Sequence, residues 1–501
     1  MKSFKDVEQN RRAYHQDAMR NSVHRSSLTV PELPGCSVDL SFLNHFKIKR
    51  GYDRVACRVT AVDAEGQRIA SILHEINERR AYTIPLTGMV QEEVETYLVD
   101  FFAADNLFIP FPASMVNHVG DGFINAVHSY NRMLNDPFED DQVNANRVAE
   151  ASIDVRVDDR IDTFAVFTAG PQRCVGELDV ELTAGGVQHR ASVALDVPRF
   201  GNELISLSQV FPQLNGVEGG VLRLRQPAQG MFYGRMLAGL RHSDGSFSAN
   251  HSYYDNSSVE EYWDTGDGSS RVYPMLSGFD TIIRMYPIMS PGELAVSVEA
   301  NATNGQVLGS IDLSALESPG EGYIDANVSR LLEQAGLDDA ASITLRAEPL
   351  SGMTPTRVNH QLVYADRRAL SPLASSINVS LLSPHMFTPE GKGSFIWGQM
   401  PSGPDWTSRL GIVCNKPEGE ATEVEIDVFG SGGHLTSRKY TVGSLGAVEI
   451  DVADIVNGHA PNNDDGYEYL WYTARSSRPD LSGIAVTGHT RTGHTTGEHN
   501  F

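Results

Sequence analysis

One pattern recurs four times along the chain and limits the folds that it can adopt. An alternating apolar and polar run is followed by a short turn with glycine and then by a second alternating run. The four turns contain Gly66, Gly186, Gly305 and Gly433, separated by 120, 119 and 128 positions. Alternation at every second residue is typical of a strand with one buried face, and glycine supplies the positive φ that tight hairpins need. The sequence therefore predicts four copies of a module built on a β-hairpin.

Length and turn residues agree with this prediction. A chain of 501 residues exceeds the usual domain size of about 100–150 residues. Its 45 glycines and 24 prolines are spread along the whole length, as expected for many short strands joined by turns. We expect an all-β protein of four antiparallel β-sandwich modules, jelly-roll or Greek-key-like, at residues 29–140, 141–270, 271–370 and 371–501. Residues 1–28 contain no glycine or proline and carry six Lys/Arg against three Asp/Glu. We expect them to form a short helical arm that precedes the first module.

Charge and hydropathy exclude some classes of partner. The sequence has 64 acidic and 40 basic residues, a formal charge of −24. Such a surface repels phosphate backbones, which argues against nucleic acid as a partner. No apolar run of 18 residues is present, so no membrane span is expected. The first residues lack the apolar segment of a secretory signal, so we expect a cytoplasmic protein or one exported by a non-classical route.

The four cysteines and the absence of common enzyme motifs limit the kinds of active site that the sequence indicates. Cys36, Cys57, Cys174 and Cys414 form no CxxC pair, and their strand-like surroundings predict free buried thiols. The sequence contains no GxSxG, GxxxxGK[ST] or HExxH motif and no GxGxxG opening a helix. Whether the protein is an enzyme stays open on these grounds.

Histidine recurs near the end of each module, and two interpretations follow. The predicted module-closing histidines are His128, His251, His360 and His499, and His118, His242 and His489 precede three of them by nine or ten positions. On a strand, each closing histidine shares a face with apolar neighbours. It can therefore be a core residue whose ring nitrogens meet backbone carbonyls. Alternatively, hairpin pairs or quartets of these rings bind zinc, copper or iron, with carboxylates such as Glu498 completing the site.

Two weaker signals concern other ligands. Tyr467, Tyr469 and Trp471 alternate on one face of a strand, where an exposed row would bind a glycan and a buried row would be ordinary packing. The acidic turns 264–268 and 462–466 offer oxygen ligands of the kind that calcium accepts, but neither has EF-hand spacing.

Duplication preserves a fold more readily than a site, so the repeat favours a structural or interaction protein. The leading hypothesis is a multi-module scaffold that self-associates or binds another protein. The first alternative is a metalloprotein, with or without enzymatic activity, whose site is built from the module-closing histidines. The second alternative is a glycan-binding protein that uses the aromatic row.

Overall fold

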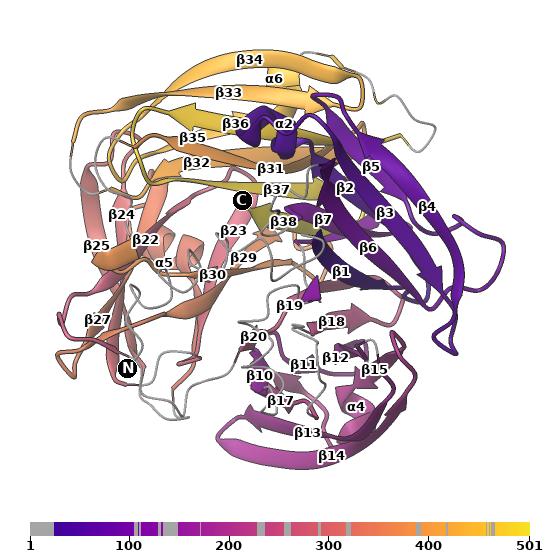
Figure 1. Ribbon diagram of the computed structural model, residues 1–501. Coiled ribbons are helices and arrows are strands. Elements are labelled where there is room, and N and C mark those ends of the chain that lie inside the picture. Colours follow the sequence, from indigo (N-terminus) through magenta and orange to yellow (C-terminus); the bar gives the residue numbers. More distant parts are fainter. Residues whose placement is uncertain are drawn as a thin grey trace.

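The computed structural model of the protein is nearly all-β, which confirms the predicted fold class (Figure 1). The structure describes residues 25–104, 109, 112–128, 132–133, 149–170, 172–227, 236–254, 262–288, 292–316, 322–386, 392–416, 419–456, 458–459, 461 and 466–501. Most of the predicted helical arm, residues 1–24, lies outside this part. Residues 25–28 of that arm are strand and not helix, because they pair with the first module.

The first two modules contain the following elements. In the first they are β1 (Arg25–Pro31), β2 (Ser37–Leu43), α2 (His45–Arg50), β3 (Val55–Val62), β4 (Arg68–Ile76), β5 (Ala81–Pro85), β6 (Thr96–Ala103), β7 (Ser114–Gly120), β8 (Phe123–His128) and β9 (Arg132–Met133). In the second they are β10 (Ala149–Ser152), β11 (Arg156–Val157), β12 (Ile161–Thr168), β13 (Cys174–Ala184), β14 (Val187–Val197), β15 (Asn202–Ser206), α4 (Leu207–Val210), β16 (Val217–Glu218), β17 (Val221–Arg225), β18 (Leu237–His242), β19 (Phe247–His251) and β20 (Tyr253–Tyr254).

The third and fourth modules follow the same plan. The third has β21 (Tyr262–Trp263), β22 (Ser269–Pro274), β23 (Phe279–Met285), β24 (Leu294–Asn301), β25 (Val307–Leu316), β26 (Ile324–Asn327), α5 (Val328–Ala335), β27 (Ser342–Pro349), β28 (Thr354–Pro355), β29 (Asn359–Asp366) and β30 (Ser375–Ser380). The short helix η2 (Pro384–Met386) leads to the fourth module, with β31 (Ser394–Ser402), β32 (Trp406–Cys414), β33 (Thr422–Gly430), β34 (Gly433–Val442), β35 (Ala447–Asp451), α6 (Val452–Val456), β36 (Glu468–Ser476), β37 (Leu481–His489) and β38 (Thr495–His499).

Each module is a sandwich of two antiparallel sheets whose strand order repeats. The outer sheets are ordered β4-β3-β6-β1, β14-β13-β17-β10, β25-β24-β27-β22 and β34-β33-β36-β31, with β9 and β20 extending the first two. The inner sheets are ordered β5-β2-β7-β8, β15-β12-β18-β19, β26-β23-β29-β30 and β35-β32-β37-β38. Eight strands that cross between two four-stranded sheets in this way have the organisation of a jelly roll.

The predicted hairpins β3–β4, β13–β14, β24–β25 and β33–β34 are present, and their turn glycines all have positive φ, between +76° and +117°. Alternation places one face of each outer sheet against the module's core. In β33, for example, Val424, Ile426 and Val428 are fully buried in the core of the fourth module. Short helices, α5 and α6, follow the hairpins of the third and fourth modules.

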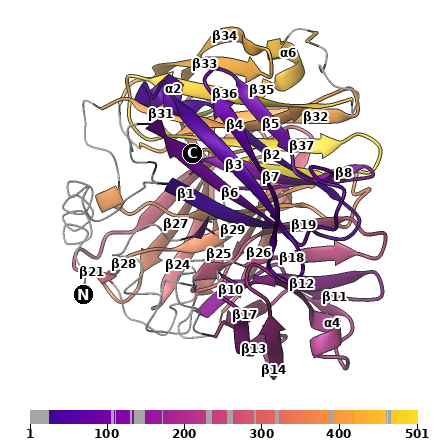
Figure 2. The same ribbon diagram turned by 45° about the vertical axis from the view of Figure 1, so that its right-hand side comes forward.

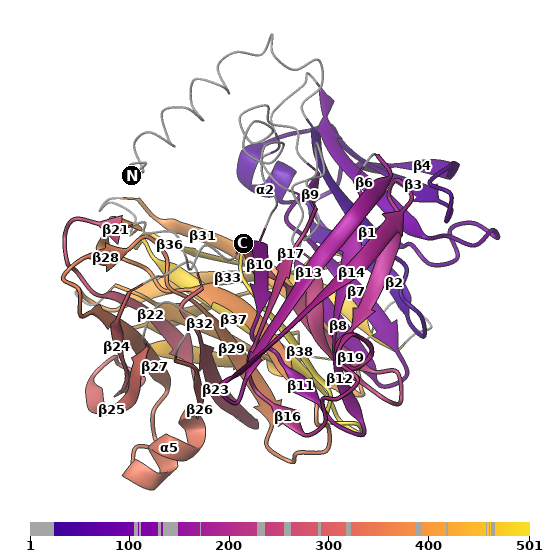
Figure 3. The ribbon, with the colours of Figure 1, turned by 90° about the horizontal axis from the view of Figure 1, so that it is seen from below.

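The last strand of each inner sheet lies at the centre of the molecule. We call β8, β19, β30 and β38 the closing strands. Each contacts two others, because β8 lies against β19 and β38, and β30 lies against the same two strands (Figures 1 and 3). The four modules therefore surround a common axis, with their hairpins at the periphery. Figure 2 shows the hairpin strands β34 and β14 at opposite ends of the molecule.

Hydrogen bonds join neighbouring modules across this axis. Three backbone N–H groups donate to side chains of the adjacent module: Ala126 to Thr496 (2.9 Å), Ala249 to Asn125 (2.7 Å) and Ser375 to Thr495 (2.7 Å). The core of the first module also continues into its neighbours, since it includes Phe247 of β19 and Trp471 of β36. Buried polar groups that are fully bonded rigidify a junction of this kind.

Three other predictions can be compared with the fold. The boundary expected at residue 370 is wrong, because β30 pairs with β29 and so belongs to the third module. All four cysteines are free thiols, and all but the half-buried Cys36 are buried, as predicted. Among the described residues, no helix is long and apolar enough to cross a membrane.

Candidate metal centre

The ring of closing strands brings three of the predicted module-closing histidines together. His128 ends β8, His251 ends β19 and His499 ends β38. The His128 ring centroid lies 4.6 Å from that of His251 and 4.8 Å from that of His499. The repeat therefore places equivalent residues of the first, second and fourth modules in one cluster at the axis.

Glu498 completes the cluster. Its Oε2 lies 3.1 Å from Nδ1 of His128 and 3.9 Å from Nε2 of His499. On the other side of the His128 ring, Nε2 lies 3.1 Å from Nε2 of His251. Within the described part of the chain, His128, Glu498 and His499 are the one group of at least three His, Cys, Asp or Glu residues that could hold a metal ion, with ligand atoms within 4.8 Å of one another.

Backbone carbonyls fix the protonation of two of these rings. Nδ1 of His251 lies 2.9 Å from the carbonyl oxygen of Ser252, and Nδ1 of His499 lies 2.7 Å from that of Asn500. A carbonyl only accepts hydrogen bonds, so these contacts place a proton on Nδ1 in both rings. The Asn378 amide nitrogen also lies near Nδ1 of His251, but at the longer distance of 3.4 Å. A neutral ring protonated at Nδ1 presents the lone pair of Nε2, and in both residues this atom faces the cluster.

The charge states near neutral pH also follow from the surroundings. Burial lowers the pKa of His499 to about 4, although Glu498 opposes this shift, so the ring is neutral at pH 7. Burial alone would raise the pKa of Glu498, but His128, His499 and the Asn250 amide outweigh it and hold this pKa below its usual value. His499 is therefore a neutral imidazole beside an ionised Glu498.

Asn250 is a site residue that the sequence analysis missed. Its Nδ2 donates to Oε1 of Glu498 at 2.9 Å and joins the second module to the fourth. A signal for it exists in the repeat, because Asn250 and Glu498 each directly precede a closing histidine. The two residues occupy equivalent positions and meet across the axis.

His360 is not a module-closing histidine, and that prediction is wrong. It lies on β29, one strand before the closing strand, and its register partner on β30 is Val379. Nε2 of His360 lies 2.6 Å from the Tyr273 hydroxyl, and burial lowers its pKa to about 3. In the first module the closing residue His128 is paired with Met115 on the preceding strand. The equivalent pair in the third module is Val379 and His360, so Val379 occupies the closing position there.

The upstream histidines do not share a site with the closing ones. In the β7–β8 hairpin His118 is opposite Asn125, whereas His128 is opposite Met115. Three residues along a strand span about 10 Å, so the predicted pair cannot share an ion. The same holds for His489, which is five residues along β37 from Ile484, the partner of His499.

Each upstream histidine has other neighbours. His118 packs against the Phe247 ring at 5.5 Å, and Nδ1 of His242 lies 3.0 Å from Asp244 in its own turn. Nδ1 of His489 accepts a hydrogen bond from the Thr492 backbone at 3.1 Å. His118 and His489 are buried, and His242 is half-buried.

The predicted glycan-binding row is not an exposed platform. Tyr469 and Trp471 are buried, and Tyr467 is half-buried. Tyr469 donates to Asp39 (3.0 Å) and Trp471 to Ser41 (2.8 Å), so the row packs the fourth module against the first. Of the two acidic turns, 264–268 is described but belongs to no cluster of three acidic residues, and 462–465 lies outside the described residues.

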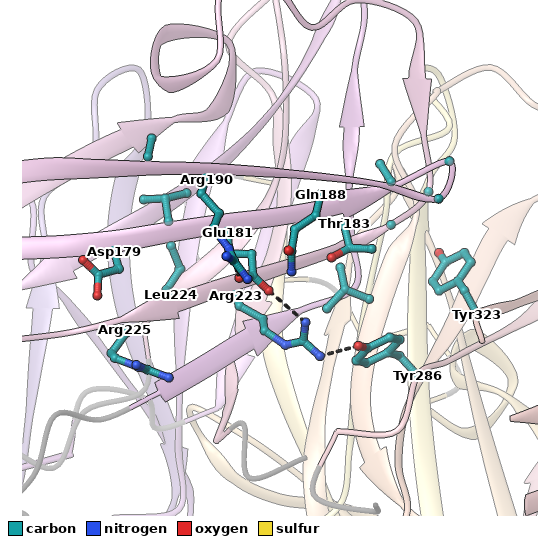
Figure 4. Close-up of a pocket in the computed structure, with 18 of the residues that line it drawn as sticks. Asp179, Glu181, Thr183, Gln188, Arg190, Arg223, Leu224, Arg225, Tyr286 and Tyr323 are labelled. Carbon is teal, nitrogen blue, oxygen red and sulfur yellow. Dashed lines mark hydrogen bonds and ion pairs between the residues drawn. The ribbon is translucent and has the colours of Figure 1, made fainter. Parts of the chain in front are cut away.

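A cavity of about 1260 Å³ lies on the outer sheet of the second module, where it faces the third (Figure 4). Glu181 accepts from Arg190 at 2.9 Å and from Arg223 at 3.1 Å, and Arg223 also donates to Tyr286. These lining groups bond to one another, so they do not present a set of unmatched donors to a ligand. The histidine cluster is therefore the stronger candidate site.

Comparisons with known proteins provide little further information. No protein-family model matches the sequence, and no curated protein matches it. One match is a solved structure described as the tetra-tandem repeat in the extending region of a large adhesion protein. The alignment covers 90% of this chain and 92% of the chain in that structure. Its sequence identity is 10% and its TM-score is 0.09, so the fold described above rests on this chain's own strand pairing.

Proposed function

We propose that the protein is a structural scaffold that self-associates through the outer edge of its second module. Its four modules form one block around the closing strands, which suits a rigid building unit. The observation that carries self-association is the strand β14. Among the described strands it is the outermost of its sheet, and all 11 of its residues pair with β13 without a register shift.

The other hairpins differ in this respect. Register shifts interrupt β3–β4, β24–β25 and β33–β34. Bulges and charged residues protect the edges of sheets from pairing with another chain. The long regular edge of β14 has less of this protection, and we take it as the surface for strand addition.

A second copy of the same chain is the partner that this edge fits. An antiparallel pairing of two β14 strands centred on Val193 places Arg190 of each copy opposite Asp196 of the other. Oppositely charged cross-strand pairs favour such a register, by roughly 0.2–1 kcal/mol each. Arg190 and Asp196 are already paired within one copy, with Glu181 and Arg173, so these exposed pairs would be shared or exchanged in the dimer.

Light scattering at high protein concentration tests the proposal. The wild-type chain should form dimers or larger species, and the double variant Ser192→Lys/Ala194→Lys should be monomeric, because lysines on an edge disfavour pairing. Both residues are exposed on β14. The matched control is Ser310→Lys on the edge strand β25, which should leave the assembly unchanged. A wild-type protein that is monomeric throughout would contradict the proposal.

A further inference from the structure

We propose that His128, His499 and Glu498 bind one divalent transition-metal ion of the zinc or iron(II) type at the axis, with His251 as the positioning partner of His128. This site goes beyond the scaffold function. It would join the first and fourth modules directly through the ion, and the second through His251.

The hydrogen-bond chain through the cluster leads to this assignment. The Ser252 carbonyl fixes the proton of His251 on Nδ1, so Nε2 of His251 is an acceptor. The contact of 3.1 Å between the two Nε2 atoms then requires that His128 be the donor. In the tautomer with its proton on Nε2, His128 has a lone pair on Nδ1, which lies 3.1 Å from Oε2 of Glu498.

Two acceptors then face each other. Nδ1 of His128 and Oε2 of the buried Glu498 are 3.1 Å apart, and Nδ1 is buried without a hydrogen-bond donor. Nε2 of His499, which carries the lone pair, lies 3.9 Å from the same carboxylate oxygen. Oε2 of Glu498 also accepts from the backbone N–H of His499 at 3.0 Å, but neither ring nitrogen gains a donor from this bond. A cation between the ring nitrogens and the carboxylate, either a proton or a metal ion, would satisfy these lone pairs.

The distances are compatible with a metal ion, since the three ligand atoms lie within 4.8 Å of one another and need only a small movement to close on it. Bonds of about 2.0–2.1 Å from zinc to nitrogen or oxygen place neighbouring tetrahedral ligands about 3.3 Å apart. The separations from Glu498 Oε2, 3.1 Å to His128 and 3.9 Å to His499, lie on either side of this value. Two imidazoles and one carboxylate are a ligand set that zinc and iron(II) use, and it leaves a coordination position for water.

Each of the three ligands is hydrogen-bonded to a further group that would not contact the ion. His128 donates to His251, Nδ1 of His499 donates to the Asn500 carbonyl, and Glu498 accepts from Asn250. Metal-binding histidines commonly donate their other N–H to such partners, which fix the orientation of the ring. The side chains of His128 and His499 remain 16% and 24% exposed, which gives an ion a route to the site.

Binding of Zn²⁺ and Co²⁺ to the metal-stripped full chain tests the site. The wild-type chain should bind one ion, measured by plasma mass spectrometry after dialysis, and Co²⁺ should produce visible d–d absorption. His499→Gln and Glu498→Gln should each abolish stoichiometric binding. His251→Gln should weaken Co²⁺ binding by about 10–100-fold and alter the absorption, as loss of an outer partner does.

The matched control is His242→Gln, which removes a histidine outside the cluster and should bind as the wild type does. Circular dichroism establishes that each variant is folded. Independently of any variant, Zn²⁺ should raise the melting temperature of the wild-type chain. The proposal is overturned if the wild-type chain binds neither ion, in which case the cation is a proton. It is equally overturned if the folded Glu498→Gln/His499→Gln variant binds as tightly as the wild type.

Discussion

Nε2 of His128 lies 3.1 Å from Nε2 of His251, although 123 positions separate these residues in the chain. They end equivalent strands of neighbouring modules. Their contact shows that the sequence repeat is also a spatial repeat about one axis. The features of each module that meet there, the closing strands and their last residues, determine both the rigidity of the molecule and its candidate chemistry.

Acid should destabilise the protein in part through His118. Burial lowers the pKa of this ring to about 4, against an opposing backbone hydrogen bond with Asn125. The ordinary pKa of histidine is about 6.5. Below pH 6.5 His118 is therefore protonated in the unfolded chain but stays neutral in the folded chain, so stability falls as the pH drops from about 6.5 to 4. Between pH 7 and 4.5, His118→Leu should lose roughly 2–3 kcal/mol less stability than the wild type in urea unfolding.

The control for this prediction is His434→Gln, which replaces a more exposed ring on β34. It should follow the wild-type pH profile. Equal acid sensitivity of the wild-type and His118→Leu proteins would show that His118 has the same pKa in the folded and unfolded chains.

Trp471 should stabilise the junction between the fourth and first modules. It is fully buried and donates a hydrogen bond to Ser41 at 2.8 Å. Trp471→Ala should cost about 3–5 kcal/mol of unfolding free energy, and Trp471→Phe about 1–3 kcal/mol because Ser41 loses its partner. Guanidinium unfolding measures both. The half-buried Tyr467 is the comparison, and a cost for Tyr467→Ala as large as that of Trp471→Ala would argue against the junction role.

The turn glycines provide a matched pair of variants. Gly186 and Gly305 have φ of +76° and +85°, so alanine should cost each about 1–2 kcal/mol in backbone strain. A Cβ at Gly186 meets nothing within 4 Å, whereas one at Gly305 overlaps the backbone of Ser444 in the fourth module. Gly305→Ala should therefore lower the melting temperature clearly more than Gly186→Ala. Equal effects would mean that the two modules do not touch at this turn.

Local features of the fold were predictable from the sequence, because they depend on neighbouring residues. The alternation around Gly66, Gly186, Gly305 and Gly433 identified the four hairpins, since a tight turn and its strands are specified within about 20 residues. The arrangement of the modules depends on contacts between closing strands more than 100 positions apart. No local pattern specifies which strand edges meet.

His360 illustrates why the site could be predicted only in part. The Asn-His pair at 359–360 resembles the one at 250–251, and its position near the expected boundary made it seem a module-closing residue. Strand pairing assigns it to β29, and Val379 occupies the closing position. Local spacing identified the residue types, but the register across β29 and β30 decided which of them reach the axis.

The most direct test is anomalous diffraction from crystals grown with Zn²⁺, with data collected on both sides of the zinc absorption edge. We predict a single strong anomalous peak at the axis, about 2.0–2.2 Å from His128 Nδ1, His499 Nε2 and Glu498 Oε2. His251 should remain hydrogen-bonded to Nε2 of His128. A peak only elsewhere, for example at the acidic turn 264–268, or no peak at the axis, would contradict the assignment of this cluster as a metal centre.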